Sequence, residues 1–465
     1  MTNDAQLLRS AGGLAALLLL SACASGPFGL WGGNDDATEI QEDDDRVAVL
    51  ALDRTLEPDP AYVGLPVNIP PAFSNPDWTQ PGGEADHTMH HLSAPGSFSL
   101  AWDADIGEGG SRRSPLTAPP VVANGRVFTL DNVARVTAFA EDSGERVWSR
   151  EMTPDVSEEG RKFWQITGKV KPEQLGFGGG LALDGGRVFM TTGFGFAAAL
   201  DQATGEMLWQ ADLPSPVRNP PTAAEGLVYV VTTSNQVLAL DQETGDTVWT
   251  YESFEESARF LSSASPAVQG GTVVVPFSSG EVVALSAETG RLLWNATVSR
   301  ASRMNALADL NDIAGSPVVD RGAVFAISHS GQLSAIDLRT GREVWEVPVG
   351  GLNTPWISGN TLFLVTTEGE LVALARDDGG VRWVRELDSY ENMKKRKDPI
   401  TWSGPVLAGG NLILVSSRGR ALLASPQDGS TVAEFEIEEG GTIPPVVAGG
   451  TLYLLNDEGE LLAYR

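Results

Sequence analysis

The sequence predicts an all-β protein, an eight-bladed β-propeller of four-stranded antiparallel blades that is closed by an N-terminal strand. Three observations predict this fold. A unit of roughly 46 residues, typical of propeller blades, recurs from Gly96 to the last residue, Arg465. Most units contain a tight turn followed four residues later by Trp. One spare strand precedes the first complete unit.

The repeats are clearest at residues 226–249, 271–294 and 322–345. Earlier copies begin at residues 125 and 186, later ones at 360 and 450, and a weaker copy begins near 410. A single four-stranded unit buries neither face of its sheet alone, so neighbouring units are expected to stack around an axis. Seven blades remain the alternative if the weak copy at 404–434 does not form.

Each unit predicts four strands in order. A Ser-Pro segment such as Ser316–Val319 is expected to form the inner strand, and a β-branched and aromatic run such as Val324–Ile327 the second. A third strand ends in Ala-Leu-Asp or a variant of it. The element Asp-x-x-Thr-Gly then predicts a tight turn, because Gly adopts positive φ and Asp or Thr side chains bond the turn backbone.

The fourth strand carries the repeated Trp. We expect each Trp to pack against the small Ala and the Gly turn of the next blade rather than to line a ligand pocket. Seven of the 12 tryptophans occupy this position: Trp102, Trp148, Trp209, Trp249, Trp294, Trp345 and Trp383. The weak copy has Ala433 instead.

The two ends of the repeat region predict how the ring closes. The last unit stops at Arg465, before a fourth strand. The segment Phe98–Trp102 is a fourth strand without a preceding unit, so it should complete the eighth blade and remove an exposed edge.

The first 22 residues predict a lipoprotein signal peptide. The apolar run Ala11–Leu20 is shorter than the roughly 20 residues that a membrane-spanning helix needs. Leu20-Ser21-Ala22-Cys23 resembles a bacterial lipobox, which implies cleavage before Cys23 and its lipidation; an ordinary signal peptide with a chance Cys is the alternative. No Asp follows at the second position, so we expect the outer membrane, facing the periplasm.

Residues 23–96 predict an acidic, largely disordered tether, and residues 97–465 the propeller. From Ala24 to Asp86 there are 13 acidic and two basic side chains, and such a composition buries little apolar surface. His87, His90 and His91 are a weak metal signal, and we expect them in a surface loop.

Charge and cysteine content exclude several classes. The net charge of −29 and the pI near 4.4 argue against nucleic-acid binding and against simple electrostatic docking to anionic lipid. The single Cys excludes an intramolecular disulfide. The basic run Lys394–Lys397 is compatible with an acidic partner, with anionic head groups or with a solvated loop.

The units resemble the repeats of pyrroloquinoline-quinone (PQQ) propellers, as in Ala199–Trp209. The segment Asp77–Gly83 resembles the opening of such propellers. The resemblance admits a quinoprotein dehydrogenase or a ligand-binding propeller, but this chain has neither the vicinal Cys pair common in that class nor a c-type haem motif. We therefore predict no enzyme, no catalytic residues, no cofactor and no metal.

A lipidated eight-bladed propeller of this kind is similar to the BamB family of lipoproteins. That resemblance implies a scaffold of the outer-membrane β-barrel assembly machinery. Its implied partners are the periplasmic POTRA domains of BamA, other assembly-complex lipoproteins, unfolded outer-membrane protein clients, and the membrane through the lipid anchor.

The resemblance also maps two partner-binding loops. The first is Glu255–Ser262, where Arg259, Phe260 and Leu261 keep the apolar and Arg composition of the family but not its Leu-x-Leu-Arg order. The second is Arg303–Ala314, where Leu310-Asn311-Asp312-Ile313 matches Leu-x-Asp-Val and Asp312 falls on an acidic contact; a second family acid is replaced by Ala314. Phe260 and Leu261 would supply burial, and Arg259 and Asp312 orientation. Packing of Phe260 and Leu261 into the propeller is the alternative.

Overall fold

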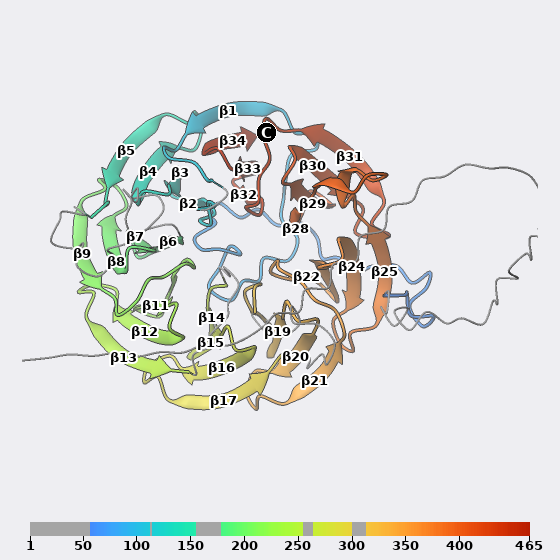
Figure 1. Cartoon of the computed structure of the whole chain (residues 1–465), viewed down its shortest axis with the longest axis horizontal. Helices are drawn as coiled ribbons and strands as arrows, with labels where there is room; N and C mark the ends of the chain where they lie inside the picture. Colours follow the sequence, from blue (N-terminus) through green and yellow to red (C-terminus); the bar gives the residue numbers. More distant parts are fainter. Residues whose placement is uncertain (1–55, 112–113, 155–177, 254–263, 300–312) are drawn as a thin grey trace, which may run out of the picture. The chain divides into compact units, whose positions relative to one another are not determined.

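The computed structural model describes residues 56–111, 114–154, 178–253, 264–299 and 313–465. These residues belong to one compact unit, Thr55–Arg465. Their regular structure is entirely β, and they include no helix long and apolar enough to cross a membrane. Eight four-stranded sheets are arranged around a centre, with the first strand of each nearest to it (Figure 1). The predicted eight-bladed propeller is confirmed.

Each blade pairs its strands in sequence order, and all pairs are antiparallel. Blades 1 and 2 contain β2 (Val121–Ala123), β3 (Arg126–Leu130), β4 (Arg135–Ala140), β5 (Arg146–Glu151), β6 (Gly179–Asp184), β7 (Arg187–Thr192), β8 (Phe196–Asp201) and β9 (Met207–Asp212). Blades 3 and 4 contain β10 (Thr222–Ala224), β11 (Leu227–Val231), β12 (Gln236–Asp241), β13 (Thr247–Glu252), β14 (Ala267–Gln269), β15 (Thr272–Pro276), β16 (Glu281–Ser286) and β17 (Leu292–Thr297).

The second half repeats the pattern with one insertion. Blades 5 and 6 contain β18 (Val318–Asp320), β19 (Ala323–Ile327), β20 (Leu333–Asp337), β21 (Glu343–Val347), β22 (Trp356–Ser358), β23 (Thr361–Val365), β24 (Glu370–Ala375) and β25 (Val381–Glu386). A separate hairpin of β26 (Tyr390–Asn392) and β27 (Lys397–Pro399) follows. Blade 7 contains β28 (Trp402–Ala408), β29 (Asn411–Ser416), β30 (Arg420–Ala424) and β31 (Thr431–Glu436), and blade 8 contains β32 (Val446–Ala448), β33 (Thr451–Leu455) and β34 (Glu460–Tyr464).

The N-terminal strand closes the ring as predicted. β1 (Leu100–Asp105) pairs antiparallel with β34, which places Trp102 beside Ala463. The sheet order is β1-β34-β33-β32, so the fourth strand of blade 8 comes from the other end of the described chain. Closure of this kind leaves no blade incomplete.

All seven repeated tryptophans lie in the predicted position, each against the turn glycine of the next blade. The Trp249 ring, for example, is so close to Gly290 that a Cβ added there would lie 2.6 Å from two ring carbons. Its indole N–H also donates to the carbonyl of Ala287, at 2.8 Å. The same glycine contact recurs for Trp102, Trp148, Trp209, Trp294, Trp345 and Trp383 with Gly144, Gly205, Gly245, Gly341, Gly379 and Gly429.

The missing eighth Trp has a structural reason. Blade 7 carries Ala433 in the Trp position, beside Leu423. Its neighbour, blade 8, has no turn between its third and fourth strands, because β34 and β1 belong to opposite ends of the chain. A different aromatic cluster lies there: Phe435 stacks on Phe98 at 5.9 Å and meets Tyr464 at 5.1 Å between ring centroids.

The Asp-x-x-Thr-Gly turns are held as their side chains predict. Asp201 Oδ1 accepts hydrogen bonds from the backbone N–H of Ala203 and from both the N–H and hydroxyl of Thr204, at 2.8 to 3.0 Å. These bonds lower the pKa of the Asp201 carboxyl, even though it is exposed to solvent. Gly205 ends the turn at φ 72°, a conformation that favours glycine.

Strand direction divides the ring into two faces. Because strands alternate in direction, every connection from the outer strand of one blade to the inner strand of the next lies on one face, which we call the connection face. The turns after the first and third strands lie on the opposite face. The hairpin β26–β27 connects β25 to β28, so it belongs to the connection face.

Residues 75–92, which we call the strap, run along the inner strands of the ring. Trp78 exchanges backbone hydrogen bonds with Val122 of blade 1, at 2.7 and 2.8 Å. Leu92 does the same across blade 7, donating to Leu407 and accepting from Gly409. Blades 2, 3, 4, 5, 6 and 8 are bonded through Thr79, Gln80, Ala85, Asp86, His90 and Asn75 of the strap. The segment crosses the centre of the ring in Figure 1.

The strap contradicts part of the predicted tether. Residues 56–96 lie against the propeller, and Trp78, Met89 and Leu92 are buried in its core. Trp78 also stacks on Trp356 of blade 6, at 6.2 Å between centroids. This segment is ordered because its backbone pairs with hydrogen-bonding groups that the inner strands leave unpaired. The acidic composition of the segment does not reveal these partners. Residues 23–55 lie outside the described residues.

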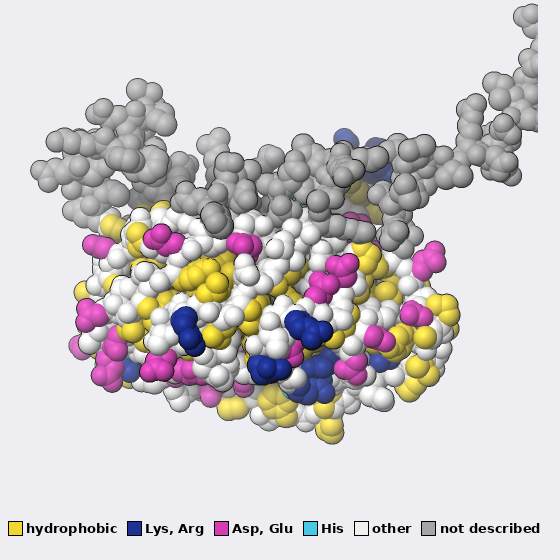
Figure 2. All heavy atoms as spheres, turned by 90° about the horizontal axis from the view of Figure 1, so that it is seen from below, with side chains coloured by type: hydrophobic (Ala, Val, Ile, Leu, Met, Phe, Trp, Pro, Cys, Tyr) yellow, Lys and Arg dark blue, Asp and Glu magenta, His cyan; other side chains and the backbone are white. Residues whose placement is uncertain are grey.

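The rim of the ring consists of the outer strands. Figure 2 looks onto one side of it, where apolar, Asp or Glu, and Lys or Arg side chains all reach the surface. The exposed apolar residues of the outer strands include Val147, Met207, Leu208, Val248, Leu292, Leu293, Val344 and Val432.

Candidate functional site

The predicted partner-binding side chains lie outside the described residues. Arg259, Phe260 and Leu261 fall between β13 and β14, and Asp312 falls between β17 and β18. Cys23 is also outside them. The described residues that flank the two loops belong to the connection face, at the junctions of blades 3, 4 and 5.

The inner-strand ends of these loops are fixed by a chain of hydrogen bonds across four blades. The Ser265 hydroxyl donates to the carbonyl of Pro220, at 2.9 Å, and the Ser265 N–H donates to the hydroxyl of Ser316, also at 2.9 Å. The Ser316 N–H in turn donates to Thr354, at 3.1 Å. Ser265 and Ser316 are buried, so these bonds are shielded from water. The Ser-Pro motif that precedes the inner strands of blades 4 and 5 therefore also joins neighbouring blades.

The outer-strand end of the first loop is anchored differently. The Ser253 hydroxyl donates to Glu281 Oε2 at 2.8 Å, and Ser279 donates to the same oxygen at 3.2 Å. Tyr251 lies on Phe277 at 6.3 Å, and burial, together with the charge of Glu281, raises its pKa. Polar and aromatic contacts thus hold both ends of this loop.

The basic run forms the tip of the hairpin β26–β27. Its sequence does not define its conformation, and the structure places Lys394, Lys395 and Arg396 in the turn and Lys397 at the start of β27. All four are exposed. Beside the hairpin stem lies a cleft of about 460 Å³, lined by Asp388, Tyr390, Glu391, Ile400, Arg418, Gly419, Arg420, Glu436 and Ile437.

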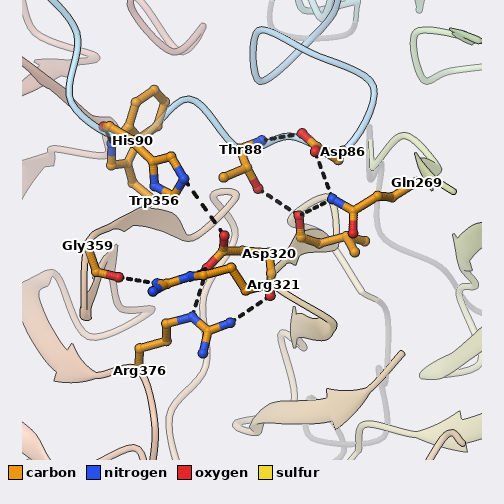
Figure 3. A network of polar contacts seen from close by, with 10 residues as sticks. Asp86, Thr88, His90, Gln269, Asp320, Arg321, Trp356, Gly359 and Arg376 are labelled. Atoms are coloured by element: carbon orange, nitrogen blue, oxygen red, sulfur yellow. Dashed lines mark hydrogen bonds and ion pairs between the residues drawn. The ribbon is translucent and has the colours of Figure 1, made fainter. Parts of the chain in front are cut away.

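A polar network joins the strap to blades 5 and 6 on the opposite face (Figure 3). Asp320 is 4 % exposed, and its Oδ2 accepts from the Nε of Arg376 at 2.7 Å and of Arg321 at 2.9 Å. The His90 ring nitrogen lies 3.7 Å from the other carboxylate oxygen. Arg376 also donates to the Asp320 carbonyl and lies over the Phe325 ring, so two guanidinium groups balance one buried carboxylate.

Two of the three strap histidines, His87 and His91, are buried and do not lie in a surface loop, contrary to the sequence prediction, whereas His90 is partly exposed. His87 is buried, and its Nδ1 donates to the carbonyl of Pro317 at 2.7 Å. Burial lowers the pKa of His87. His91 donates from Nδ1 to Pro70 and accepts from Gly410 at Nε2, so both ring nitrogens are used in packing. Within the described ranges, no group of three or more His, Cys, Asp or Glu is arranged to hold a metal ion.

The repeat region is similar in sequence to known proteins. The family described as outer membrane protein assembly factor BamB matches residues 155–385. The outer membrane protein assembly factor BamB of Shigella dysenteriae serotype 1 is 29 % identical over 365 residues, covering 78 % of this chain and 88 % of the relative. That of Escherichia coli K12 is 28 % identical with the same coverage.

Solved structures share the fold. The crystal structure of BamB from Moraxella catarrhalis superposes with a TM-score of 0.63 at 22 % identity, covering 79 % of this chain and all of that one. A quinohemoprotein alcohol dehydrogenase from Comamonas testosteroni superposes with a TM-score of 0.64 at 15 % identity, covering 84 % of this chain and 81 % of that one. At these identities the superpositions establish the propeller alone. The sequence similarity is more specific, because the family model and both curated relatives carry the description outer membrane protein assembly factor BamB.

Proposed function

We propose that this chain is a non-catalytic scaffold lipoprotein of outer-membrane protein assembly. The observation that carries the proposal is its relationship to proteins named outer membrane protein assembly factor BamB, which spans 88 % of their length. In this role the chain binds BamA POTRA domains and contacts other assembly-complex lipoproteins. It also aids the folding and insertion of outer-membrane proteins. Its place is the outer membrane, with the propeller in the periplasm and Cys23 as the lipid anchor.

The arrangement of the ring supports a scaffold. The loops that carry Arg259, Phe260, Leu261 and Asp312 begin and end on the connection face, and buried hydrogen bonds between blades fix their inner-strand ends. Rigidly held loop ends reduce the entropy that a partner must overcome on binding. The alternative is a quinoprotein dehydrogenase or a ligand-binding propeller. The strap disfavours it, because this chain's own residues occupy the centre of the ring (Figure 1).

A pull-down of the tagged protein from its own membranes in mild detergent tests the partner. We expect a β-barrel protein with periplasmic POTRA domains to be recovered as the main partner. Recovery of a redox partner or a bound quinone cofactor instead would reject the scaffold and support the dehydrogenase alternative.

Two variants test the named residues. Phe260→Asp combined with Asp312→Arg should abolish capture of the POTRA protein, because it removes apolar burial and reverses a charge. Val248→Asp combined with Asp246→Arg makes the same changes on the rim, at exposed positions of blade 3, and should leave capture unchanged. Equal capture by both variants would reject these loops as the binding site.

The lipid anchor has its own test. Cys23→Ala should release the protein from the membrane fraction, since acyl chains are the only anchor in the proposal. A variant that still sediments with membranes after a salt wash would show that the anchor lies elsewhere.

A further inference from the structure

The hairpin β26–β27 concentrates positive charge on a protein of net charge −29. All three lysines among the described residues lie in it: Lys394, Lys395 and Lys397. Arg396 completes a run of four cations at the tip. Glu391 and Asp398 at the stem offset two of these charges, so residues 390–399 carry a net charge of +2. The sign of the local charge is therefore opposite to that of the whole chain.

These cations are not neutralised by the parts of the protein that the structure describes. Among the described residues, the cations that form ion pairs are His90 and arginines outside this hairpin. Nearly every residue of both hairpin strands is exposed, so the tip projects from the ring instead of packing on it. Met393, at the same tip, is 59 % exposed. The surface thus combines four solvated cations with one apolar side chain.

The tip is held in place from its base. Tyr390 pairs with Pro399 and Asn392 with Lys397, and the N–H of Lys395 donates to Asn392 across the turn. Below the pairing, the Ile400 N–H donates to Ser389, at 2.9 Å.

Two arginines of blade 7 secure the stem. Arg418 donates to the carbonyl of Pro399. Arg420 donates to the Asp388 carboxylate at 2.9 Å and lies over the Trp402 ring, 5.3 Å from its centroid. The charges are therefore presented by a preformed element, which loses little conformational freedom on docking.

We infer that the tip of β26–β27 docks on anionic lipid head groups at a membrane surface. A membrane attracts clustered cations without shape complementarity, and each Lys or Arg near an anionic surface adds about five-fold to binding. An exposed Met can enter the boundary between head groups and acyl chains. A stable protein interface needs roughly 800 Å² on each partner with a buried apolar centre, which a five-residue tip does not supply. The inference uses only charge and geometry, so it holds or fails independently of the proposed assembly role.

Vesicle co-sedimentation tests this inference. The chain from Ala24 onward, which lacks the lipid anchor and retains every described residue, is mixed with vesicles of phosphatidylglycerol and phosphatidylcholine in equal parts, or of phosphatidylcholine alone. We expect binding only to the anionic vesicles, and loss of that binding at high salt as the Debye length shortens. Lys394→Gln with Lys395→Gln should weaken binding by about 25-fold, the product of two five-fold effects.

Matched variants separate the tip from net charge. Arg339→Gln with Arg342→Gln removes two exposed charges from the opposite face and should leave vesicle binding unchanged. Lys394→Arg with Lys395→Arg should retain binding, because the charge is kept. The inference is overturned if the unaltered chain ignores anionic vesicles, or if both Gln variants weaken binding equally. It is also overturned if the tip variant loses only capture of the POTRA protein, which would assign the tip to an acidic protein surface.

Discussion

The contact between Trp249 and Gly290 makes the blade interface quantitatively testable. Gly290 has φ 66°, and a Cβ there would lie 2.6 Å from two atoms of the Trp249 ring. Gly290→Ala should therefore lower the free energy of unfolding for two reasons. The left-handed backbone costs about 1–2 kcal/mol for a residue with a Cβ, and the collision with the ring adds about 1–3 kcal/mol.

Removing the ring removes the second cost. Trp249→Ala alone should lower the free energy of unfolding by about 3–5 kcal/mol, because it leaves a cavity between blades. In that background Gly290→Ala should cost only the backbone part, about 1–2 kcal/mol. The two substitutions should therefore be less damaging together than the sum of their single effects, by about 1–3 kcal/mol.

Equilibrium urea unfolding followed by circular dichroism measures all four proteins of this cycle. Gly322→Ala is the matched control: Gly322 has φ 78° but no atom lies within 4 Å of its added Cβ. It should cost only the backbone part and show no coupling to Trp249→Ala. Additivity of Trp249→Ala and Gly290→Ala within about 0.5 kcal/mol would refute the proposed packing of Trp against glycine.

Two further predictions concern the strap. Gln80 donates to the carbonyl of Ala223 and accepts from its N–H, at 2.7 and 3.0 Å. Gln80→Leu should lower the free energy of unfolding by about 2–4 kcal/mol in urea titration, since two buried backbone groups lose their partner; Gln236→Leu, a change in a partly exposed side chain, should cost far less. Burial lowers the pKa of His87, so below about pH 6.5 the unfolded chain binds a proton that the folded imidazole does not. Stability should therefore fall as pH drops from about 6.5; His87→Gln should remove that component of the acid sensitivity, and an unchanged pH profile of the melting temperature would contradict it.

The sequence predicted the blades well because their signals are local and repeated. Each alternating strand, each Asp-x-x-Thr-Gly turn and each Trp is a local signal, and its recurrence from unit to unit reinforces the prediction. The spare strand before Trp102 and the truncated unit at Arg465 were sufficient to predict closure. The exception at Ala433 is explained by the adjacent blade, because blade 8 has no glycine turn against which a Trp could pack.

The strap was missed because its order comes from distant partners. The segment occurs once, shows no periodicity and is acidic, so its composition predicts disorder. Its stability depends on inner strands up to about 370 residues away, as in the hydrogen bond from Asn75 Nδ2 to the carbonyl of Val447, at 2.6 Å. His87 and His91 became buried for the same reason. The proposed partner residues Arg259, Phe260, Leu261 and Asp312 stay predictions.

The strap also imposes an order on biogenesis. It is synthesised before every strand that it binds, and β1 is synthesised before the β34 that pairs with it. A nascent chain therefore carries both segments with their backbone groups unpaired until Val447 and Tyr464 have been made. Contacts of such long sequence separation form slowly, so we expect the two ends of the ring to join late in folding. A chaperone that protects the emerging chain should therefore bind the strap and β1, because their backbone groups remain unpaired for the longest time.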